Sequence, residues 1–317
     1  YGQSAGARGA YYLGDGLFSS DDSGKSWQPI ASTSAGNPLS FTTGWQLVWN
    51  LAVDPSAADT ANEIYAAIYN QIQRSSNGGK TWVSQLAGGY FTDVAVTSKG
   101  IVYATSSSDG AKKGIFRANN DGKLVNINPL FLGTTYKRIV IGVDPNNENV
   151  VYFLLNTDGF GRKSANYKGD IEWNGLYRYT YIKGDGSGDS GVWEDLSMNL
   201  PNGGVFDRWN VQGSYDMLVR VRPGNSQEVY IGGTNVYRSS TGFSDSTHTE
   251  KIGGYKLKAQ FPDVGVWANH HPDQHNLLFY PNDGSKLLSS NDGGVFRSVS
   301  LSASPFAWES LNNGYLT

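Results

Sequence analysis

The segment His270-His-Pro-Asp-Gln-His275 places three of the chain's four histidines beside an aspartate. In an extended strand, side chains at period two point to one side, so His271, Asp273 and His275 would share a face. Two imidazoles and a carboxylate on one face could bind a divalent metal, act in catalysis or bind a sugar. Pro272 can turn the chain, and imidazole–carboxylate contacts often only hold loops in place. A structural role is therefore favoured, and we expect no bound metal or cofactor.

Aspartates are the other residues that could act in catalysis, because their carboxyl groups can serve as acid or base. Hydrolysis of a glycoside uses two of them, one on each side of the bond that breaks. The aspartates that could form such a pair are Asp207, Asp216, Asp263 and Asp273. If the chain is an enzyme, we expect the acid and base to be Asp216 with either Asp207 or Asp273.

The elements that carry these residues belong to a repeat. An apolar strand ending in a small turn recurs five times, at Leu51–Pro55, Val94–Ser98, Ile141–Pro145, Val219–Pro223 and Leu277–Pro281. A second short strand follows each copy and is centred on Tyr65, Tyr103, Tyr152, Tyr230 and Leu288 in turn. Connections of this length are typical of tight hairpins.

A second recurring feature is a turn of the form S-x-D-x-G-x-T-W, clearest at Ser20–Trp27 and Ser75–Trp82. A carboxylate or amide at its third position can accept turn N–H groups, and glycine at its fifth position permits a positive φ. Weaker copies lie at Arg117–Lys123, Tyr177–Trp193, Tyr237–Gly242 and Phe296–Trp308. We therefore assign a structural role to Ser20, Asp22, Gly24, Trp27, Ser75, Asn77, Gly79 and Trp82.

Four short antiparallel strands per unit, repeated at spacings of about 40 residues, predict an all-β fold, a β-propeller of four-stranded antiparallel blades. Six repeat units are visible in the sequence, and they could form part of a larger propeller. A β-sandwich is the alternative, but its strands would not fall into quartets. We expect residues 1–317 to be a single domain with no helix longer than about two turns.

The first unit, Ala10–Ile30, lacks an inner strand, and the chain stops where another would begin. Incomplete sheets expose unpaired backbone groups, which proteins normally avoid. We therefore expect the functional protein to continue beyond Thr317, and before Tyr1 as well, or another chain to supply the missing strand.

The turn motif is similar to the Asp-box (BNR repeat) of sialidases, sortilin-type receptors, xyloglucanase-type glycoside hydrolases and photosystem assembly propellers. A further series resembles secreted Bacteroidetes-type propellers described as sortilin-like or glycosyl hydrolase-like: Gln212–Asp216, Val229–Gly233, His271–His275, Asn291–Ser298 and Trp308–Gly314. The resemblance implies a bacterial protein that is extracellular or on the cell surface. The chain has no Arg-Ile-Pro motif, which argues against a sialidase, and no cysteine for the cysteine-rich module of sortilin-type receptors.

In a propeller, the loops that lead into the inner strands share one face with the loops between the second and third strands. That face is the usual ligand site by analogy of fold. Three long loops, 156–175, 197–214 and 258–274, should also rise on it. We expect ligand-binding residues there, namely Arg138, Trp209, Tyr215, Trp267, His271 and His275.

Composition narrows the classes of function. Glycine contributes 40 residues and aromatic residues 13%, whereas charged residues are only 17%, which is typical of strands and turns. The net charge is −3 and the basic residues are scattered, so neither nucleic acid nor an anionic membrane is indicated as a partner. The longest apolar run, Val150–Leu155, is too short for membrane insertion.

We therefore expect a secreted or cell-surface propeller that binds a glycan or protein ligand on its loop face. The first alternative is a glycoside hydrolase acting on a polysaccharide with a paired-carboxylate mechanism. The second is a structural component of a surface assembly. Glycan binding measured together with reducing-sugar release would separate the first two.

Overall fold

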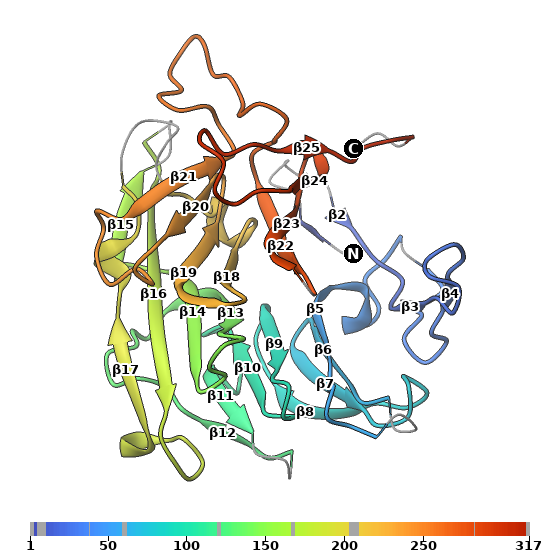
Figure 1. Cartoon of the computed structure of the whole chain (residues 1–317). Coiled ribbons are helices and arrows are strands. Elements are labelled where there is room, and N and C mark those ends of the chain that lie inside the picture. The colour runs from blue at the N-terminus through green and yellow to red at the C-terminus, as the bar shows by residue number, and fades with distance from the viewer. Residues whose placement is uncertain are drawn as a thin grey trace. The chain divides into compact units, whose positions relative to one another are not determined.

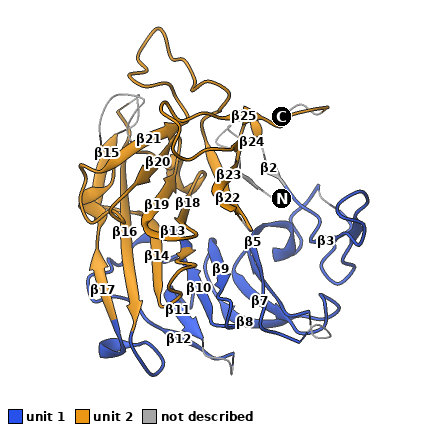
Figure 2. Ribbon diagram, in the orientation of Figure 1, with its two compact units in different colours: residues 1–141, 182–191 blue, residues 142–181, 192–317 orange. Residues whose placement is uncertain are grey.

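The computed structural model describes residues 3–4, 11–37, 39–58, 62–118, 122–165, 169–202, 209–281 and 283–314. The chain divides into two compact units, residues 1–141 with 182–191 and residues 142–181 with 192–317 (Figure 2). Helix is confined, in these ranges, to four 3-10 helices of three residues each: η1 (Gly44–Gln46), η2 (Gly188–Ser190), η3 (Ser197–Asn199) and η4 (Gln212–Ser214). No helix in the described ranges is long and apolar enough to span a membrane.

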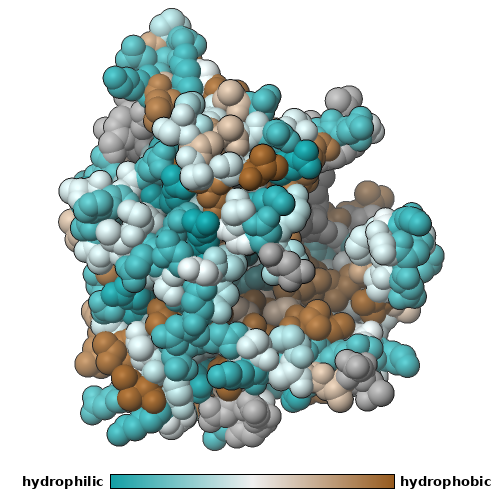
Figure 3. Space-filling model, viewed as in Figure 1, coloured by the Kyte–Doolittle hydropathy of each residue, from teal (hydrophilic) through white to brown (hydrophobic). Residues whose placement is uncertain are grey.

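Unit 1 contains two four-stranded antiparallel sheets (Figure 1). One has strands in chain order: β5 (Val48–Val53), β6 (Ile64–Ile68), β7 (Gln71–Ser75) and β8 (Val83–Ala87). The other has the same simple order: β9 (Thr92–Val96), β10 (Val102–Ser106), β11 (Gly114–Ala118) and β12 (Leu124–Asn126). Their facing sides share an apolar core that includes Tyr65, Ile72, Val94 and Phe116. Figure 3 shows a hydrophobic area near β5, where Leu51 and Val53 are exposed.

A five-stranded sheet follows, built from β13 (Tyr136–Val143), β14 (Val150–Thr157), β15 (Arg162–Ala165), β16 (Ile171–Tyr181) and β17 (Gly191–Asp195). Its order is β13-β14-β16-β15, and β17 also pairs with β16. The extra strand β15 arises from the predicted insertion at 156–175, which forms a hairpin with the start of β16.

Unit 2 contains two further four-stranded sheets whose strands run in chain order. One comprises β18 (Leu218–Arg222), β19 (Asn225–Gly232), β20 (Val236–Ser239) and β21 (Thr249–Gly253). The other comprises β22 (Gln274–Tyr280), β23 (Asp283–Asn291), β24 (Gly294–Ser298) and β25 (Glu309–Ser310). Leu218, Tyr230, Leu277 and Phe296 belong to the core that these sheets share. Since β18 contacts β22, the inner strands of these two sheets are neighbours.

The fold is an all-β propeller of small antiparallel sheets, and the number of blades is five rather than the predicted six. The five predicted inner strands overlap β5, β9, β13, β18 and β22. The remaining predicted unit, the first in the chain (Ala10–Ile30), contributes β2 (Tyr11–Tyr12), β3 (Phe18–Ser19) and β4 (Gln28–Pro29). With no inner strand to pair with, these strands form two separate pairs, β3 with β4 and β2 with β1 (Gln3–Ser4).

The two clearest turns have the hydrogen bonds that their sequences predict. In the first, Asp22 Oδ1 accepts from the Ser26 N–H at 2.8 Å, and Ser20 Oγ accepts from the Gly24 N–H at 2.8 Å. The indole N–H of Trp27 donates to the Gly24 carbonyl at 3.2 Å. The second turn repeats these contacts with Ser75, Asn77, Gly79, Thr81 and Trp82. Gly24 and Gly79 have φ values of 82° and 83°, a region that favours glycine.

Candidate active site

Four carboxyl groups gather in unit 2 near the starts of β18 and β22. Asp216 lies two residues before β18, and Asp273 directly precedes β22. Asp292 directly follows β23, and its backbone N–H donates to the Asp273 carbonyl at 3.2 Å. Burial raises the pKa of Asp216 well above its usual value, and the charges of Asp273, Glu172 and Asp292 raise it further. The four groups therefore interact electrostatically.

Asp292 is the carboxylate of this cluster that is held in its ionised form. Its Oδ1 accepts a hydrogen bond from the Tyr215 hydroxyl at 2.9 Å and lies 2.6 Å from Nε2 of His275. The rings of Tyr215 and His275 meet edge to face, with centroids 5.1 Å apart. Burial alone would raise the pKa of Asp292, but the hydrogen bonds from His275 and Tyr215 outweigh it and hold that pKa below its usual value.

The pKa of Asp273 is shifted in the opposite direction from that of Asp292. Burial, followed by the negative charge of Asp292, raises the pKa of Asp273 to about 6, although His271 and His275 oppose this shift. Its Oδ1 accepts a hydrogen bond from the Gln212 amide at 2.7 Å. Asp273 thus holds a proton at mildly acidic pH while Asp292 is charged.

Asp216 is completely buried. Neither of its carboxyl oxygens has a hydrogen-bond partner among the described residues. A carboxylate buried in this way is strongly disfavoured, so burial favours the neutral form of Asp216. Because no part of it is exposed, Asp216 cannot contact a substrate in this structure.

The turn that carries Asp216 has an unusual backbone. The N–H groups of Ser214 and Tyr215 both donate to the Val211 carbonyl at 3.0 Å. Three consecutive residues have left-handed φ values: Gln212 at 47°, Gly213 at 66° and Ser214 at 92°. Asp273 has a φ of 64° as well. Non-glycine residues in this region are strained, and such strain clusters at functional sites.

Glu172, on the insertion, fixes this turn from outside. Its Oε1 accepts from the Val211 N–H at 2.7 Å, and its Oε2 accepts from the Gly213 N–H at 2.9 Å. The Ser214 hydroxyl donates to Asn156 Oδ1 at 2.9 Å, which is a second tie to the same insertion. The insertion therefore positions the residues before β18.

The structure brings together Asp216, Asp273, Tyr215, His271 and His275 from the set that the sequence predicts. Of the remaining candidates, Asp207 lies outside the described residues.

Two tryptophans occupy a different environment from the expected one. Trp209 is buried and packs against Tyr237, with ring centroids 6.3 Å apart. Trp267 is also buried, and its indole N–H donates to the Phe306 carbonyl at 2.9 Å. The sequence placed both rings on the ligand face, whereas they pack in the interior, where large apolar side chains gain most from burial.

Arg138 belongs to β13 in unit 1. Its guanidinium carbon lies 5.9 Å from the centroid of the Trp49 ring, in cation–π range. It therefore has an aromatic partner within its own unit.

His270 is a core residue. Its ring stacks on Trp308 with centroids 4.2 Å apart, and Nδ1 accepts from the Gly254 N–H at 3.1 Å. Nε2 lies 3.0 Å from the Ser289 hydroxyl. Burial lowers the pKa of His270 to about 3, so the imidazole is neutral and structural.

The alternative of a metal held by His271, Asp273 and His275 is not supported by the geometry. No group of three or more such side chains in the described ranges is placed to hold a metal ion. The positive φ of Asp273 interrupts the extended backbone that the prediction assumed. His271 Nδ1 lies 3.0 Å from the Pro272 carbonyl, and His275 contacts Asp292 instead.

Sequence reasoning missed Asp292, Glu172 and Gln212 as members of the site. Asp292 lies in the Asn291–Ser298 segment that carries the family resemblance, so it could have been chosen from there. Glu172 lies inside the 156–175 loop, which was predicted to rise on the ligand face, but it was not singled out there. Gln212 likewise begins the Gln212–Asp216 segment of that resemblance.

No family model matches the chain, and no curated protein sequence does. Among solved structures, the β-propeller resembles a GH74 enzyme from Niastella koreensis, with a TM-score of 0.47 and 15% identity over 94% of this chain and 51% of that one. It also resembles a GH74 xyloglucanase from Xanthomonas campestris, with a TM-score of 0.45 and 16% identity over 94% of this chain and 50% of that one. A GH93 α-L-arabinofuranosidase from Fusarium graminearum gives a TM-score of 0.49 and 13% identity, covering 89% of this chain and 79% of its own. The chain spans about half the length of these two GH74 structures.

Proposed function

We propose that this chain carries the active site of a glycoside hydrolase in which Asp273 is the general acid and Asp292 is its carboxylate partner. The observation that supports this is a pair of neighbouring carboxyl groups in opposite environments. Asp273 is largely buried beside another negative charge, whereas Asp292 accepts hydrogen bonds from Tyr215 and His275. Two titratable groups whose surroundings separate their pKa values are suited to acid and base roles at one pH.

The chemistry follows from these two protonation states. Protonated Asp273 gives its proton to the glycosidic oxygen as the bond from that oxygen to the anomeric carbon breaks. Ionised Asp292 either attacks the anomeric carbon or takes the proton of an attacking water molecule. The anomer of the first product, read by NMR, distinguishes these two routes.

Asp216 has a different role in this proposal from the one that the sequence suggested. Since its carboxyl group is fully buried, it supports the turn before β18 rather than contacting the sugar. Asp273 stays in the pair, now as its acid, and Asp292 takes the place of Asp216 as its partner.

A role limited to binding a glycan or protein ligand would need the same face but no such carboxyl pair. The pair therefore favours hydrolysis over binding alone. An extracellular or cell-surface location remains part of the proposal and follows from the sequence resemblance.

The test is reducing-sugar release from a panel of β-glucans, xylans, arabinans, mannans and pectins. We expect release by the unaltered chain and its loss in D273N and D292N. D263N is the matched control, because Asp263 is exposed and pairs with Lys256 rather than with the cluster. Binding of a polysaccharide without release, in the unaltered chain, would overturn the hydrolase proposal and favour the binding role.

A further inference from the structure

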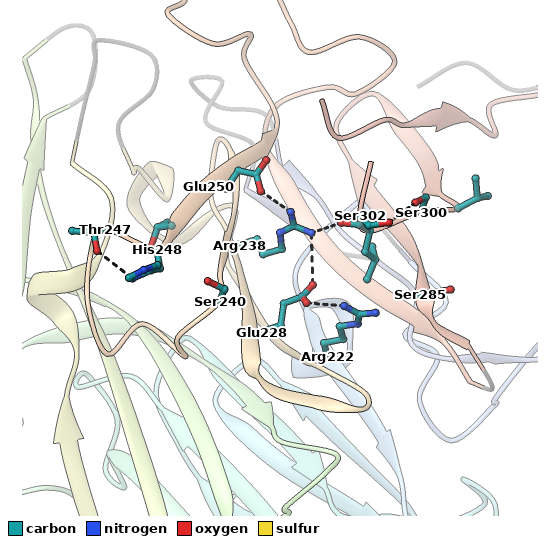
Figure 4. A pocket seen from close by; sticks show the side chains of 13 residues that line it. Arg222, Glu228, Arg238, Ser240, Thr247, His248, Glu250, Ser285, Ser300 and Ser302 are labelled. Carbon is teal, nitrogen blue, oxygen red and sulfur yellow. Dashed lines mark hydrogen bonds and ion pairs between the residues drawn. The ribbon is translucent and has the colours of Figure 1, made fainter. Parts of the chain in front are cut away.

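A cavity of about 760 Å³, lined mostly by polar side chains, lies in unit 2 (Figure 4). It is at the opposite end of β18 from the carboxyl cluster. Asp216 precedes the first residue of β18, whereas Arg222, its last residue, lines the cavity. Glu228 from β19, Arg238 from β20 and Glu250 from β21 lie along the same wall. The turn that follows β24 forms another part of the lining. The cavity is therefore separate from the proposed active site and belongs to the same pair of sheets.

The charges in this cavity balance one another. Arg222 Nη1 donates to Glu228 Oε2 at 2.7 Å, and Arg238 Nη2 donates to Glu250 Oε2 at 2.5 Å. Arg238 Nη1 also lies 3.7 Å from Glu228 Oε1. Two guanidinium groups and two carboxylates thus alternate along one wall, so the wall has no excess charge of either sign.

These side chains are held in fixed orientations. Arg222 Nε donates to the Gly284 carbonyl at 2.9 Å, and Arg238 donates to the Leu301 carbonyl. The Tyr230 hydroxyl donates to Glu228 from within the core. A site whose polar groups are already ordered loses little side-chain entropy when it binds a ligand.

Hydroxyl groups and the imidazole of His248, which pairs with Asp245, provide the remaining polar surface of the cavity. Ser240, Thr249, Ser300 and Ser302 all contribute to its lining.

We propose that this cavity binds a neutral saccharide and is a second carbohydrate site of the protein. Each sugar hydroxyl both donates and accepts, so vicinal hydroxyls match a wall on which donors from arginine alternate with acceptors from glutamate. An anionic ligand would meet two carboxylates, and the positive charges that could attract it are already neutralised. The site would hold a polysaccharide on the protein without cleaving it, and the proposal does not depend on hydrolase activity.

The test is calorimetric titration of the 317-residue chain with three neutral probes, cellotetraose, xylotetraose and maltotetraose, and one acidic probe, tetragalacturonic acid. We expect at least one neutral probe to bind with a millimolar Kd. R222M removes donors from the wall and S302W fills the mouth, and each should weaken that binding by about tenfold or more. R74M and S84W are the matched controls. Arg74 forms an ion pair of the same kind with Glu63, outside the cavity.

Measurements on D292N separate this proposal from the hydrolase proposal. D292N should lose sugar release and retain binding of the neutral probe. R222M should lose that binding and retain sugar release from short substrates. The saccharide proposal is overturned if no neutral probe binds, if binding is insensitive to both R222M and S302W, or if the acidic probe binds more tightly. Thermal unfolding of each variant shows whether it is folded. If S302W is not folded, the binding measured with R222M alone tests the saccharide proposal.

Discussion

The hydroxyl of Tyr215 donates a hydrogen bond to Asp292 at 2.9 Å, joining the loop before β18 to the turn after β23. The two residues are 77 positions apart in the sequence. His275 contacts the same oxygen of Asp292, so one carboxylate is held by two neighbouring blades. The hydrogen bonds from His275 and Tyr215 together lower the pKa of Asp292, which favours its ionised form beside Asp273.

Replacing Tyr215 with phenylalanine should raise the pKa of Asp292. A hydrogen bond to a charged group contributes about 1.5 kcal/mol or more, and one pKa unit corresponds to about 1.4 kcal/mol. We therefore expect the acidic limb of the kcat/KM profile to move up by about one pH unit in Y215F. Y181F is the control, because Tyr181 is the last residue of β16, at the opposite end of that strand from Glu172. An unchanged acidic limb would show that Tyr215 does not stabilise the charge.

The pH dependence of hydrolysis should be a bell with its optimum on the acidic side. Asp273 must be protonated, so activity should fall as pH rises through about 6. Asp292 must be ionised, so activity should fall again below its lowered pKa. D273N should reduce kcat/KM by about 10²- to 10⁴-fold and remove the basic limb from any residual rate. Activity that increases through pH 6 would contradict the assignment of Asp273 as the acid.

The repeat could be predicted from the sequence because each blade carries its own local signal. The apolar strands and glycine turns recur at regular spacing, and the five inner strands lie where that spacing indicated. The blade count was wrong for a physical reason: the segment around Phe18 has turn residues but no inner strand with which to complete a sheet.

The site was predicted only where a residue lies beside an inner strand, as Asp216 and Asp273 do. Asp292 and Glu172 reach the cluster from other strands, through contacts that depend on how the sheets pack. Trp209 and Trp267 were predicted to lie on the ligand face but are buried, since an aromatic residue in a long loop can pack inward as readily as outward. Burial of Asp216 could not be read from the sequence, because it depends on the fold of the whole turn.

Asp216 should make the stability of the protein depend on pH. The pKa of Asp216 is raised in the folded state, so above about pH 4 the unfolded chain loses a proton that the folded chain keeps. Folding is therefore disfavoured progressively as pH rises from the unfolded to the folded pKa. D216N removes this loss, so its melting temperature relative to the unaltered chain should increase as pH rises above about 4. D263N is the control, and a difference that does not vary with pH would show that Asp216 is not protonated in the folded state.

The final prediction concerns Glu172 and the strained turn that it holds. E172A removes both acceptors of the Val211 and Gly213 N–H groups, and each unmade bond should cost about 1 kcal/mol. Because Glu172 is partly exposed, water replaces some of this loss, and we expect a lower melting temperature in a folded protein. The loss of kcat/KM should be larger than the loss of stability alone would cause. Displacement of the turn moves Gln212 away from Asp273 and Tyr215 away from Asp292. E172Q retains one acceptor and should lie between E172A and the unaltered chain in both measurements. If E172A lowers the melting temperature and leaves kcat/KM unchanged, Glu172 stabilises the insertion without positioning the site.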